Sequence, residues 1–541
     1  MSYNAPVSDM RFALEACADL WSLRERYPEL DEVTLAAILE GAGALAADTL
    51  APINRSGDQA GVTLKDGVVT AAPGFREAYE AFKQGGWQGL AADPAYGGQG
   101  LPRSVALAVM ETVHSANMSF GLLPMLTLGA IEAIEQHGAP DQKQLYLEKL
   151  ISGEWTGTMN LTEPQAGSDL GALTTKAVPQ ADGSYAITGQ KIFITWGEHD
   201  LAPNIIHLVL ARIEGAPAGS KGISMFIVPK FRDEDGSRNA VRCIGVEEKM
   251  GIHASPTCTL AYEGATGWLI GEENRGLHAM FTMMNAARLN VGMEGVAVAE
   301  AAYQKALAYA KERKQGGGFI IQHPDVRRML MTMKAKIQAA RAICYATAVA
   351  ADRGDKARED LLTPLAKVCG TDAGVEVTSL GVQVHGGMGF VEEGGAAQFY
   401  RDARIAPIYE GTNGIQAIDL YGRKLLGDRG EAMSALIAEA RQTAGSGHPK
   451  FLAAIEALED ATAYMLSAPR EDALAGAYAY LQLAADVAGA MLLIQGGARD
   501  ANPEQAAVLR FYARTILARA PSRLAEIKLR AAVLASEDFA S

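Results

Sequence analysis

The chain has 541 residues, and 49% of them are hydrophobic, so it can form several domains with large buried cores. Its net charge of −14 disfavours nucleic acids and anionic membrane surfaces as partners, although a local basic patch is compatible with it. The N-terminus has no basic segment followed by an apolar one, so we expect no signal peptide, no membrane span and a cytoplasmic location. Wide spacing of the cysteines and histidines predicts reduced thiols and no metal site; the cysteines are Cys17, Cys243, Cys258, Cys344 and Cys369.

Residues 1–154 have the pattern of a mainly helical region. Asp31 is suited to cap the first long helix, and Pro73 is suited to the first turn of the second. A Gly- and Pro-rich stretch over 87–102 predicts a long loop between helices, and a packed Ω-loop is the favoured interpretation for most of it. The predicted helices cover 32–47, 74–84, 104–117 and 122–137.

From Trp155 to about residue 272 the pattern is typical of β-structure. Alternating, β-branched and aromatic residues are bounded by turn residues, which favours strands over helices. The strands are expected over 185–195, 205–212, 223–228 and 260–264.

Helical periodicity returns after residue 273 and continues to the end of the chain. An α block, a β block and a second α block in one chain predict three packed units. The Ala- and Leu-rich residues 428–541 follow them, and such helices are more often scaffold than site. Helices are expected over 283–314, 325–352, 361–385, 431–443, 450–466, 471–494 and 504–520.

One short stretch, residues 401–416, combines helix breakers with a single acid. Pro407 blocks helix continuation, and Gly411 allows the backbone to approach a ligand closely. Glu410 lies between them beside apolar groups, where a carboxylate loses hydration and becomes a better base near neutral pH. The alternative is a solvated surface residue, which is the commoner role of a Glu in a Gly-containing loop.

A helix is predicted directly after this stretch. Thr412 or Asn413 is suited to cap it, and its N-terminus could face an anion.

Residues 401–416 closely resemble the catalytic loop of the acyl-CoA dehydrogenases. In that family the Glu of Tyr-Glu-Gly-Thr removes the α-proton of a CoA thioester, which identifies Glu410 as the candidate base. Residues 159–170 are similar to the family signature Thr-Glu-Pro-x-Ala-Gly-Ser-Asp. Some members carry the base at the position of Ala287 instead, but alanine cannot act as one, so Glu410 remains the single candidate.

The resemblance implies an α+β fold that is mostly α-helical. Because shorter family members end near Leu426, the extra C-terminal residues resemble a long subgroup, which includes 3-methylmercaptopropionyl-CoA dehydrogenases and several bacterial fatty acyl-CoA dehydrogenases. The implied domains are an N-terminal helical domain (1–154), a β-barrel domain (155–272), a four-helix bundle with the catalytic Glu (273–427) and an additional helical domain (428–541).

The same resemblance implies FAD as the cofactor. Without it, Phe193 would be interpreted as a core residue of a strand, and the Gly-rich segment around Arg313 as a helix C-cap. That segment departs from the commoner family form after its arginine. The implied FAD contacts are Met159, Leu161, Thr162, Gly167, Phe193, Thr195, Arg313, Gln315, Gln383, Gly386, Gly387, Thr412 and Asn413.

Three of these residues imply a dimer at least. In the family the positions of Gln383, Gly386 and Gly387 reach the FAD of the neighbouring subunit.

The resemblance also implies the substrate contacts. Ser168 is expected at the pantetheine arm, and Tyr409 and Gly411 are expected to contact the substrate. Arg288 is expected at the CoA end of the ligand, although an Arg inside an apolar helix is ordinarily explained by a structural ion pair.

The expected activity is oxidation of a saturated acyl-CoA to the trans-2-enoyl-CoA. Glu410 takes the α-proton, the β-hydrogen leaves as hydride to flavin N5, and electrons pass on to electron-transferring flavoprotein. Three alternatives stay open: an acyl-CoA oxidase with the same residues, a DNA-damage-response flavoprotein of the same fold, and a non-enzymatic scaffold. The net charge of −14 argues against the second, whose helical tail should be basic.

Overall fold

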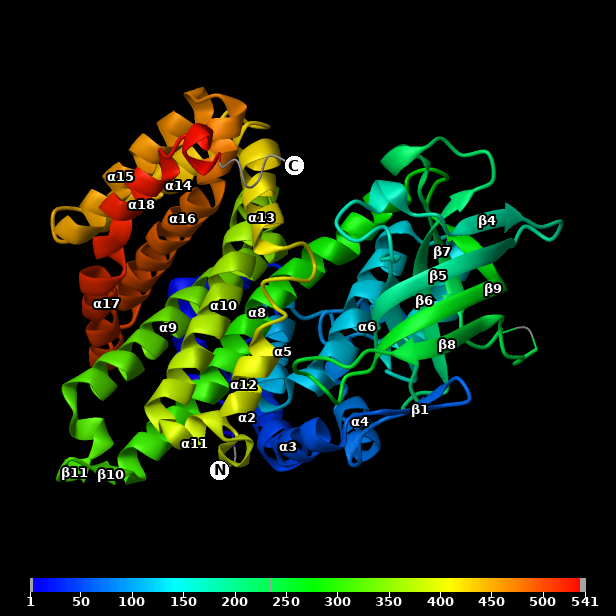
Figure 1. Cartoon of the computed structure of the whole chain (residues 1–541), viewed down its shortest axis with the longest axis horizontal. Helices are drawn as coiled ribbons and strands as arrows, with labels where there is room; N and C mark the ends of the chain where they lie inside the picture. The colour runs from blue at the N-terminus through cyan, green and yellow to red at the C-terminus, as the bar shows by residue number, and fades with distance from the viewer. Residues whose placement is uncertain (1–2, 234, 536–541) are drawn as a thin grey trace. The chain divides into compact units, whose positions relative to one another are not determined.

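The computed structural model describes residues 3–233 and 235–535 (Figure 1). It divides into two compact units. One is formed by residues 41–287, and the other by residues 3–40 together with the described residues from 288 onward. Two helices, α2 (Glu32–Leu45) and α8 (Gly276–Glu312), carry the chain from one unit to the other.

The first unit begins with helices and short turns. Asp31 caps α2 as expected, because its Oδ1 accepts a hydrogen bond from the Thr34 amide at 2.7 Å. Residues 87–102 are a loop broken only by two single 3₁₀ turns. The helices are α3 (Ala51–Ala60), α4 (Phe75–Gln84), α5 (Arg103–Ala116), α6 (Met118–His137) and α7 (Pro140–Ile151).

The β-sheet of this unit closes on itself. Its strands are hydrogen-bonded in the order β3-β6-β4-β5-β9-β7, β6 also pairs with β7, and β8 is attached to β9. The pairings make a ring of five strands around an apolar core that includes Ile187, Val209 and Phe226, so the expected barrel is present. The strands are β3 (Trp155–Asn160), β4 (Lys176–Pro179), β5 (Tyr185–Thr195), β6 (Asn204–Ile213), β7 (Ser224–Pro229), β8 (Val241–Val246) and β9 (Thr257–Ile270).

The second unit is built on long bundle helices. A left-handed Gly354 ends α9 (Pro324–Arg353), and α10 (Lys356–His385) follows almost at once, so the two pack as neighbours. Two short helices, α12 (Ala396–Ala403) and α13 (Asn413–Asp419), flank the loop that carries Glu410.

Backbone contact between α8 and α10 depends on glycine. A Cβ added to Gly370 of α10 would lie 2.0 Å from the carbonyl oxygen of Gly292 in α8. A Cβ added to Gly295 would lie 2.2 Å from the carbonyl oxygen of Gly370. A side chain at any of these positions would therefore push the two helices apart.

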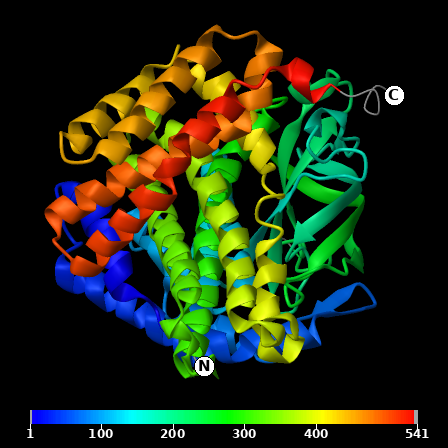
Figure 2. The ribbon, with the colours of Figure 1, turned by 60° about the vertical axis from the view of Figure 1, so that its left-hand side comes forward.

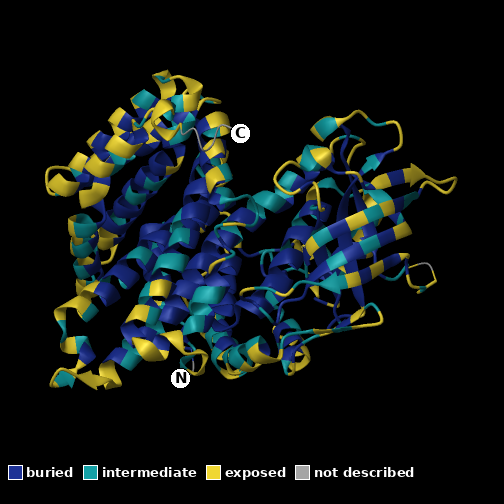
Figure 3. Cartoon of the chain, in the orientation of Figure 1, coloured by how far each residue is buried: buried dark blue, intermediate teal, exposed yellow. Residues whose placement is uncertain are grey.

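The C-terminal tail continues the same unit. Its helices, orange to red in Figures 1 and 2, pack on α9 mainly through α16 and α17 and on α10 mainly through α16, most of which is buried. Their outward faces are exposed, whereas the bundle helices beneath are mainly buried (Figure 3). The tail helices are α14 (Glu431–Ala444), α15 (Pro449–Ser467), α16 (Arg470–Arg499), α17 (Pro503–Thr515) and α18 (Ala520–Ile527).

The expectation of one helix over 504–520 is wrong. The chain forms α17 up to Thr515, a 3₁₀ turn, and then α18 from Ala520. Pro521 lies in the first turn of α18, where a proline is tolerated, whereas in a continuous helix it would break the hydrogen-bond ladder.

The first residues of the chain belong to the second unit. The helix α1 (Val7–Arg11) and the turns after it contact α9 and α16. Arg499 donates to the carbonyl oxygen of Ala16 at 2.6 Å, and Gln505 donates to Oδ1 of Asp9 at 2.9 Å. These bonds hold the N-terminal segment against the tail.

Within residues 3–233 and 235–535, three helical stretches are long and apolar enough to cross a membrane by length and composition alone. In the most apolar 18-residue window, 83% of the residues are buried in two of these stretches and 28% in the third. They are Glu32–Ala60, Met118–His137 and Arg470–Arg499. Among the described residues, no group of three or more His, Cys, Asp or Glu side chains could hold a metal ion.

Candidate active site

Glu410 lies on a strained turn between α12 and α13. Its φ of 55° and the φ of 82° at Gly411 put two successive residues in the left-handed region, which is costly for a glutamate. The turn is held by the Asn413 amide, which donates to the Pro407 carbonyl at 2.9 Å. Thr412 caps α13 by accepting from the Ile415 amide at 3.2 Å.

The carboxyl of Glu410 has the electrostatics of a base. Although the residue is only half-buried, protein surrounds the carboxyl and desolvation raises the pKa of Glu410 to about 7. The positive charges of Arg288 and Lys367 act in the opposite direction and favour the ionised form. A carboxylate with a pKa near neutrality both accepts and releases a proton readily at physiological pH.

Lys367 is a buried cation that the sequence interpretation missed. It lies on α10, and its Nζ donates to Oδ1 of Asn413 at 2.8 Å. Burial lowers the pKa of Lys367 to about 8, against the attraction of Glu410, Glu294 and Asp372. A lysine inside the apolar run Leu361–Val368 was the available signal, because a buried charge requires partners.

Glu294 is a second buried acid that the sequence interpretation missed. It lies on α8, and its Oε2 accepts a hydrogen bond from the hydroxyl of Tyr409. Burial, joined by the charge of Glu410, raises the pKa of Glu294 to about 8 although Tyr409 and Lys367 oppose the shift. Its Oε1 has no hydrogen-bond partner among the described residues and is available to carry the proton.

Arg288 lies on α8 and is buried. Its Nη1 is 3.7 Å from Oδ2 of Asp419, so the structural ion pair considered from the sequence is present. Burial lowers the pKa of Arg288, and the charges of Asp419 and Glu410 act against that shift. The expected contact with the CoA end of a ligand stays a prediction.

Phe193 is exposed, so its interpretation as a core residue is wrong. It lies on β5 at an irregularity in the pairing with β9, where its φ is 58° and 59% of its surface is accessible. Thr195 ends the same strand and is half-buried. An exposed aromatic side chain on a strained backbone offers a flat apolar surface to a ligand.

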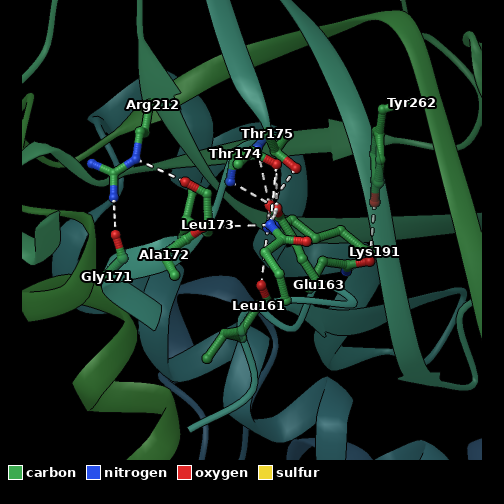
Figure 4. A network of polar contacts seen from close by, with 12 residues as sticks. Leu161, Glu163, Gly171, Ala172, Leu173, Thr174, Thr175, Lys191, Arg212 and Tyr262 are labelled. Atoms are coloured by element: carbon green, nitrogen blue, oxygen red, sulfur yellow. Dashed lines mark hydrogen bonds and ion pairs between the residues drawn. The ribbon is translucent and has the colours of Figure 1, made fainter. Parts of the chain in front are cut away.

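A buried ion pair fixes the loop between β3 and β4, as Figure 4 shows. Lys191 of β5 donates to Oε1 of Glu163 at 2.8 Å and to the carbonyl oxygen of Leu161 at 2.9 Å. Glu163 also accepts from the amides and hydroxyls of Thr174 and Thr175, at 2.6 to 3.0 Å. Every oxygen of the buried carboxylate is therefore satisfied, and the sequence interpretation had assigned no role to Glu163 or Lys191.

This network brings several of the expected FAD contacts together. The Ile192 amide donates to the Thr162 carbonyl at 2.9 Å, so Leu161 and Thr162 lie beside β5. Met159 is half-buried on β3, which leads into the loop. Gly167 and Ser168 lie farther along it and are exposed.

Arg313, Gln315, Gln383, Gly386 and Gly387 form a separate, exposed group. Stacking of Tyr309 on His385, with ring centroids 4.4 Å apart, brings the C-terminal ends of α8 and α10 together. Gln383 is 16 residues beyond Lys367 on α10, which corresponds to roughly 24 Å along the helix. These residues therefore do not share one site with Glu410 of the same chain.

We predict that Glu294→Gln makes the protein more stable at pH 9 relative to wild type. The pKa of Glu294 is about 8 in the folded state, whereas the ordinary pKa of a glutamate is 4.5. The folded state therefore loses stability as the pH rises between these two values. Glutamine accepts the same bond from Tyr409 without a titrating charge. The gain is on the order of 1–3 kcal/mol at pH 9 and vanishes at pH 4.

Thermal unfolding midpoints at pH 4, 7 and 9 measure this effect. Glu300→Gln is the matched control, since Glu300 is buried on the same helix but pairs with Arg341 at 2.9 Å. Its loss should destabilise the protein at pH 7 and 9. A Glu294→Gln protein that loses as much stability at pH 9 as the control would contradict the assignment of a protonated Glu294.

Three domain models of the acyl-CoA dehydrogenases match the chain. The N-terminal domain model matches residues 35–154, the middle domain model residues 158–265 and the C-terminal domain model residues 274–425. The tail lies beyond the last of them.

Known proteins are similar along most of the chain. The 3-methylmercaptopropionyl-CoA dehydrogenase of Ruegeria pomeroyi is 50% identical over 456 residues, which cover 80% of this chain and 77% of the relative. A chain of the solved structure described as the electron transferring flavoprotein of Acidaminococcus fermentans is 30% identical, with a TM-score of 0.65, and covers 73% of this chain and 98% of that one.

A third similarity includes the tail. Caenorhabditis elegans ACDH-11, solved in complex with C11-CoA, has a TM-score of 0.81 and 21% identity, and the match covers 95% of this chain and 92% of that one. At this identity the likeness establishes the fold alone, and that fold includes the extra C-terminal helices. The matches to all three domain models and the identity to the Ruegeria enzyme place this chain among the oxidoreductases of the acyl-CoA dehydrogenase family.

Proposed function

We propose that the protein is an FAD-dependent enzyme that oxidises an acyl-CoA thioester to the trans-2-enoyl-CoA, with Glu410 as the base. The observation that carries the proposal is the carboxyl of Glu410, held on a strained turn with a pKa near 7 and two cations facing it. A proton α to a thioester carbonyl is only weakly acidic. Its removal therefore requires a base positioned in a site that excludes water.

The residues around Glu410 support this chemistry. Arg288 and Lys367 favour the ionised carboxylate, which is the form that accepts the proton. Tyr409 is fixed by its bond to Glu294, so the residue next to the base is held in one orientation. Once the α-proton has been transferred, the neutral carboxyl is tolerated because the site is poorly hydrated.

The residues of the β-domain fit an isoalloxazine ring. Phe193 presents an exposed aromatic face, while Thr162 and Thr195 offer hydroxyls on neighbouring backbone segments.

Gly386 and Gly387, which follow α10, have open space around the position of a Cβ, as a backbone that approaches a phosphate or ring requires. FAD, when bound, supplies the acceptor for the hydride that leaves the β-carbon.

We predict that Glu410→Gln gives a folded, yellow protein that binds acyl-CoA but reduces its flavin roughly 10²–10⁴-fold more slowly. The amide keeps the shape of the side chain but cannot take the proton. In wild type, kcat/KM should fall below pH 7, because protonation of Glu410 in the free enzyme removes the base.

Anaerobic stopped-flow bleaching of the flavin measures the rate. Glu439→Gln is the control, because Glu439 is a half-buried acid of the tail in the same unit, and it pairs with Arg358 of α10. It should bleach at the wild-type rate. Rapid bleaching of Glu410→Gln at neutral pH would remove Glu410 from the role of base.

We also propose that electron-transferring flavoprotein reoxidises the enzyme. The similarity to a chain of the Acidaminococcus structure supports an acceptor of this class. An acyl-CoA oxidase is the rival, because it uses the same base and passes the electrons to oxygen. The bulky side chains of Ile408 and Tyr409, directly before Glu410, favour a site closed to oxygen.

We predict that substrate-reduced enzyme with product bound reoxidises slowly in air and rapidly with electron-transferring flavoprotein. The substrates to test are straight acyl-CoAs of graded length and 3-methylmercaptopropionyl-CoA, the last chosen because of the Ruegeria relative. Stopped-flow absorbance follows reoxidation, and a peroxide assay without added acceptor is the control. Peroxide formed at the rate of turnover would identify an oxidase instead.

We propose a homodimer in which the exposed group Gln383, Gly386 and Gly387 completes the FAD site of the partner subunit. Gln383 lies near the end of α10, far from Lys367, and Gly386 and Gly387 directly follow that helix, so all three are remote from the Glu410 site of their own chain.

We predict that light scattering of the yellow protein gives twice the chain mass. Gln383→Ala should lower FAD retention, whereas Glu392→Gln on the next exposed turn should not. A monomer that retains FAD would rule out the shared site.

A further inference from the structure

Asn413, three residues after Glu410, connects the catalytic loop to α10. Its Oδ1 accepts from Lys367 at 2.8 Å, and its Nδ2 donates to Oγ1 of Thr371 at 3.0 Å and to Oδ1 of Asp372 at 2.9 Å. Only 6% of its surface is exposed. The amide group can therefore take one orientation only, which is set by the lysine on one side and the aspartate on the other.

The other oxygen of Asp372 is held by the tail. The hydroxyl of Tyr478 donates to Oδ2 of Asp372 at 2.6 Å, and Nε2 of Gln482 donates to the same oxygen at 3.1 Å. Both residues lie on α16, one helical turn apart. Hydrogen bonds to a carboxylate are shorter and stronger than neutral ones, so this contact is a firm attachment between the tail and α10.

Gln482 is itself fixed by α18, the last α-helix that the structure describes in the tail. Its Oε1 accepts from Arg523 of α18, whose Nε also donates to Oδ2 of Asp486 at 2.9 Å. The amide orientation that lets Gln482 donate to Asp372 is thereby determined. An uninterrupted series of side-chain contacts runs from α18 through α16 and α10 to the catalytic loop.

We propose that Tyr478 and Gln482 are positioning residues for the catalytic loop: by holding Asp372 they orient Asn413, and Asn413 keeps the ammonium group of Lys367 beside Glu410. The inference rests on the proposed role of Glu410 as the base. It assigns the tail a part in the reaction, although no tail residue up to 535, where the described part of the chain ends, has a hydrogen bond or ion pair with the base.

The charge on Glu410 depends on groups from two helices that face it. Arg288 and Glu294 lie on α8, and Lys367 lies on α10 with Asp372 one turn beyond it. Of these, Arg288 has a second anion in Asp419, whereas the ammonium of Lys367 bonds to Asn413. A misplaced Asn413 therefore weakens the support that Lys367 gives to ionised Glu410.

The site of the proposed contact tolerates substitution. Tyr478, Gln482 and Asp372 line an open cavity of about 750 Å³, and Tyr478 is 36% exposed. Loss of a hydroxyl there leaves no buried hole, and water can reach the freed oxygen of Asp372. Tyr478→Phe should accordingly fold, and the double variant with Gln482→Leu removes both donors.

Tyr480→Phe is the matched control. Tyr480 lies on α16 as well, two residues after Tyr478, but it is fully buried and its hydroxyl bonds to Thr462 within the tail at 3.0 Å. This variant loses a tyrosine hydroxyl from the same helix without touching Asp372. It separates a general weakening of the tail from loss of the specific contact.

The first experiment is hydrogen–deuterium exchange of the yellow protein without substrate. We expect peptides that cover 407–416 to exchange roughly 3–10-fold faster in Tyr478→Phe and faster still in the double variant, with no change in Tyr480→Phe. Unchanged exchange of this loop in the double variant would overturn the inference, whatever the enzyme does with acyl-CoA.

The second experiment is the pH dependence of kcat/KM. We expect the acidic limb of the kcat/KM profile of the double variant to shift to higher pH by about 0.5 to 1 unit. This shift corresponds to a loss of kcat/KM of roughly 3–10-fold at pH 6.5, which is recovered at pH 9. An equal loss at every pH would overturn the inference, because a merely structural effect does not shift the limb. If the wild-type protein oxidises no acyl-CoA, the proposed function fails, and loop exchange alone decides the contact.

Discussion

The close approach of α8 and α10 is the constraint on which the Glu410 site depends. Gly292 and Gly295 of one helix meet Gly370 of the other with their backbones in contact. Glu294 and Lys367, each within three residues of such a contact, are thereby buried in the same small volume as the loop. Two acids and two cations share this volume, and none of them is fully neutralised by a single partner, so burial shifts the pKa of each.

Backbone strain and electrostatics act together at the loop. Glu410 adopts a left-handed conformation that glycine would adopt at less cost, and the Thr412 cap and the Asn413 amide compensate for it within the same turn. In the other unit, Phe193 also has a positive φ, at one of the two irregularities of β5. The two residues with the most specific expected roles are thus among the few non-glycine residues that adopt this conformation.

Local pattern was sufficient to predict most elements of the fold. The bundle and barrel segments followed from periodicity, and the caps at Asp31 and Thr412 from residue type. Glu410 was identified as the candidate base from the helix breakers on either side of it and from the family motif. The break after Thr515 was missed because apolar periodicity continues across it, while the proline that prevents one continuous helix, Pro521, lies six residues farther on.

The partners of Glu410 could not be predicted in the same way. Lys367 and Glu294 lie on helices where one charged residue among apolar ones has many possible partners, and sequence distance does not show which of them meet. The ion pair between Glu163 and Lys191 was missed for the same reason, because a loop and a strand 28 residues apart become neighbours only in the folded barrel. Likewise, Phe193 matches the pattern of a core strand residue, and only the irregular pairing of β5 with β9 turns it outward.

The burial of α16 bears on how such a chain is assembled from parts. It packs on both α9 and α10, and Arg499 at its end is bonded to the first turns of the chain. The tail is therefore not an appendage that recombination could add or remove at Gly427. A chain of the shorter length would need polar residues on the uncovered sides of α9 and α10, and a different neighbour for its own N-terminal segment. The presence of the tail and the apolar surface of the bundle helices that it covers must therefore change together.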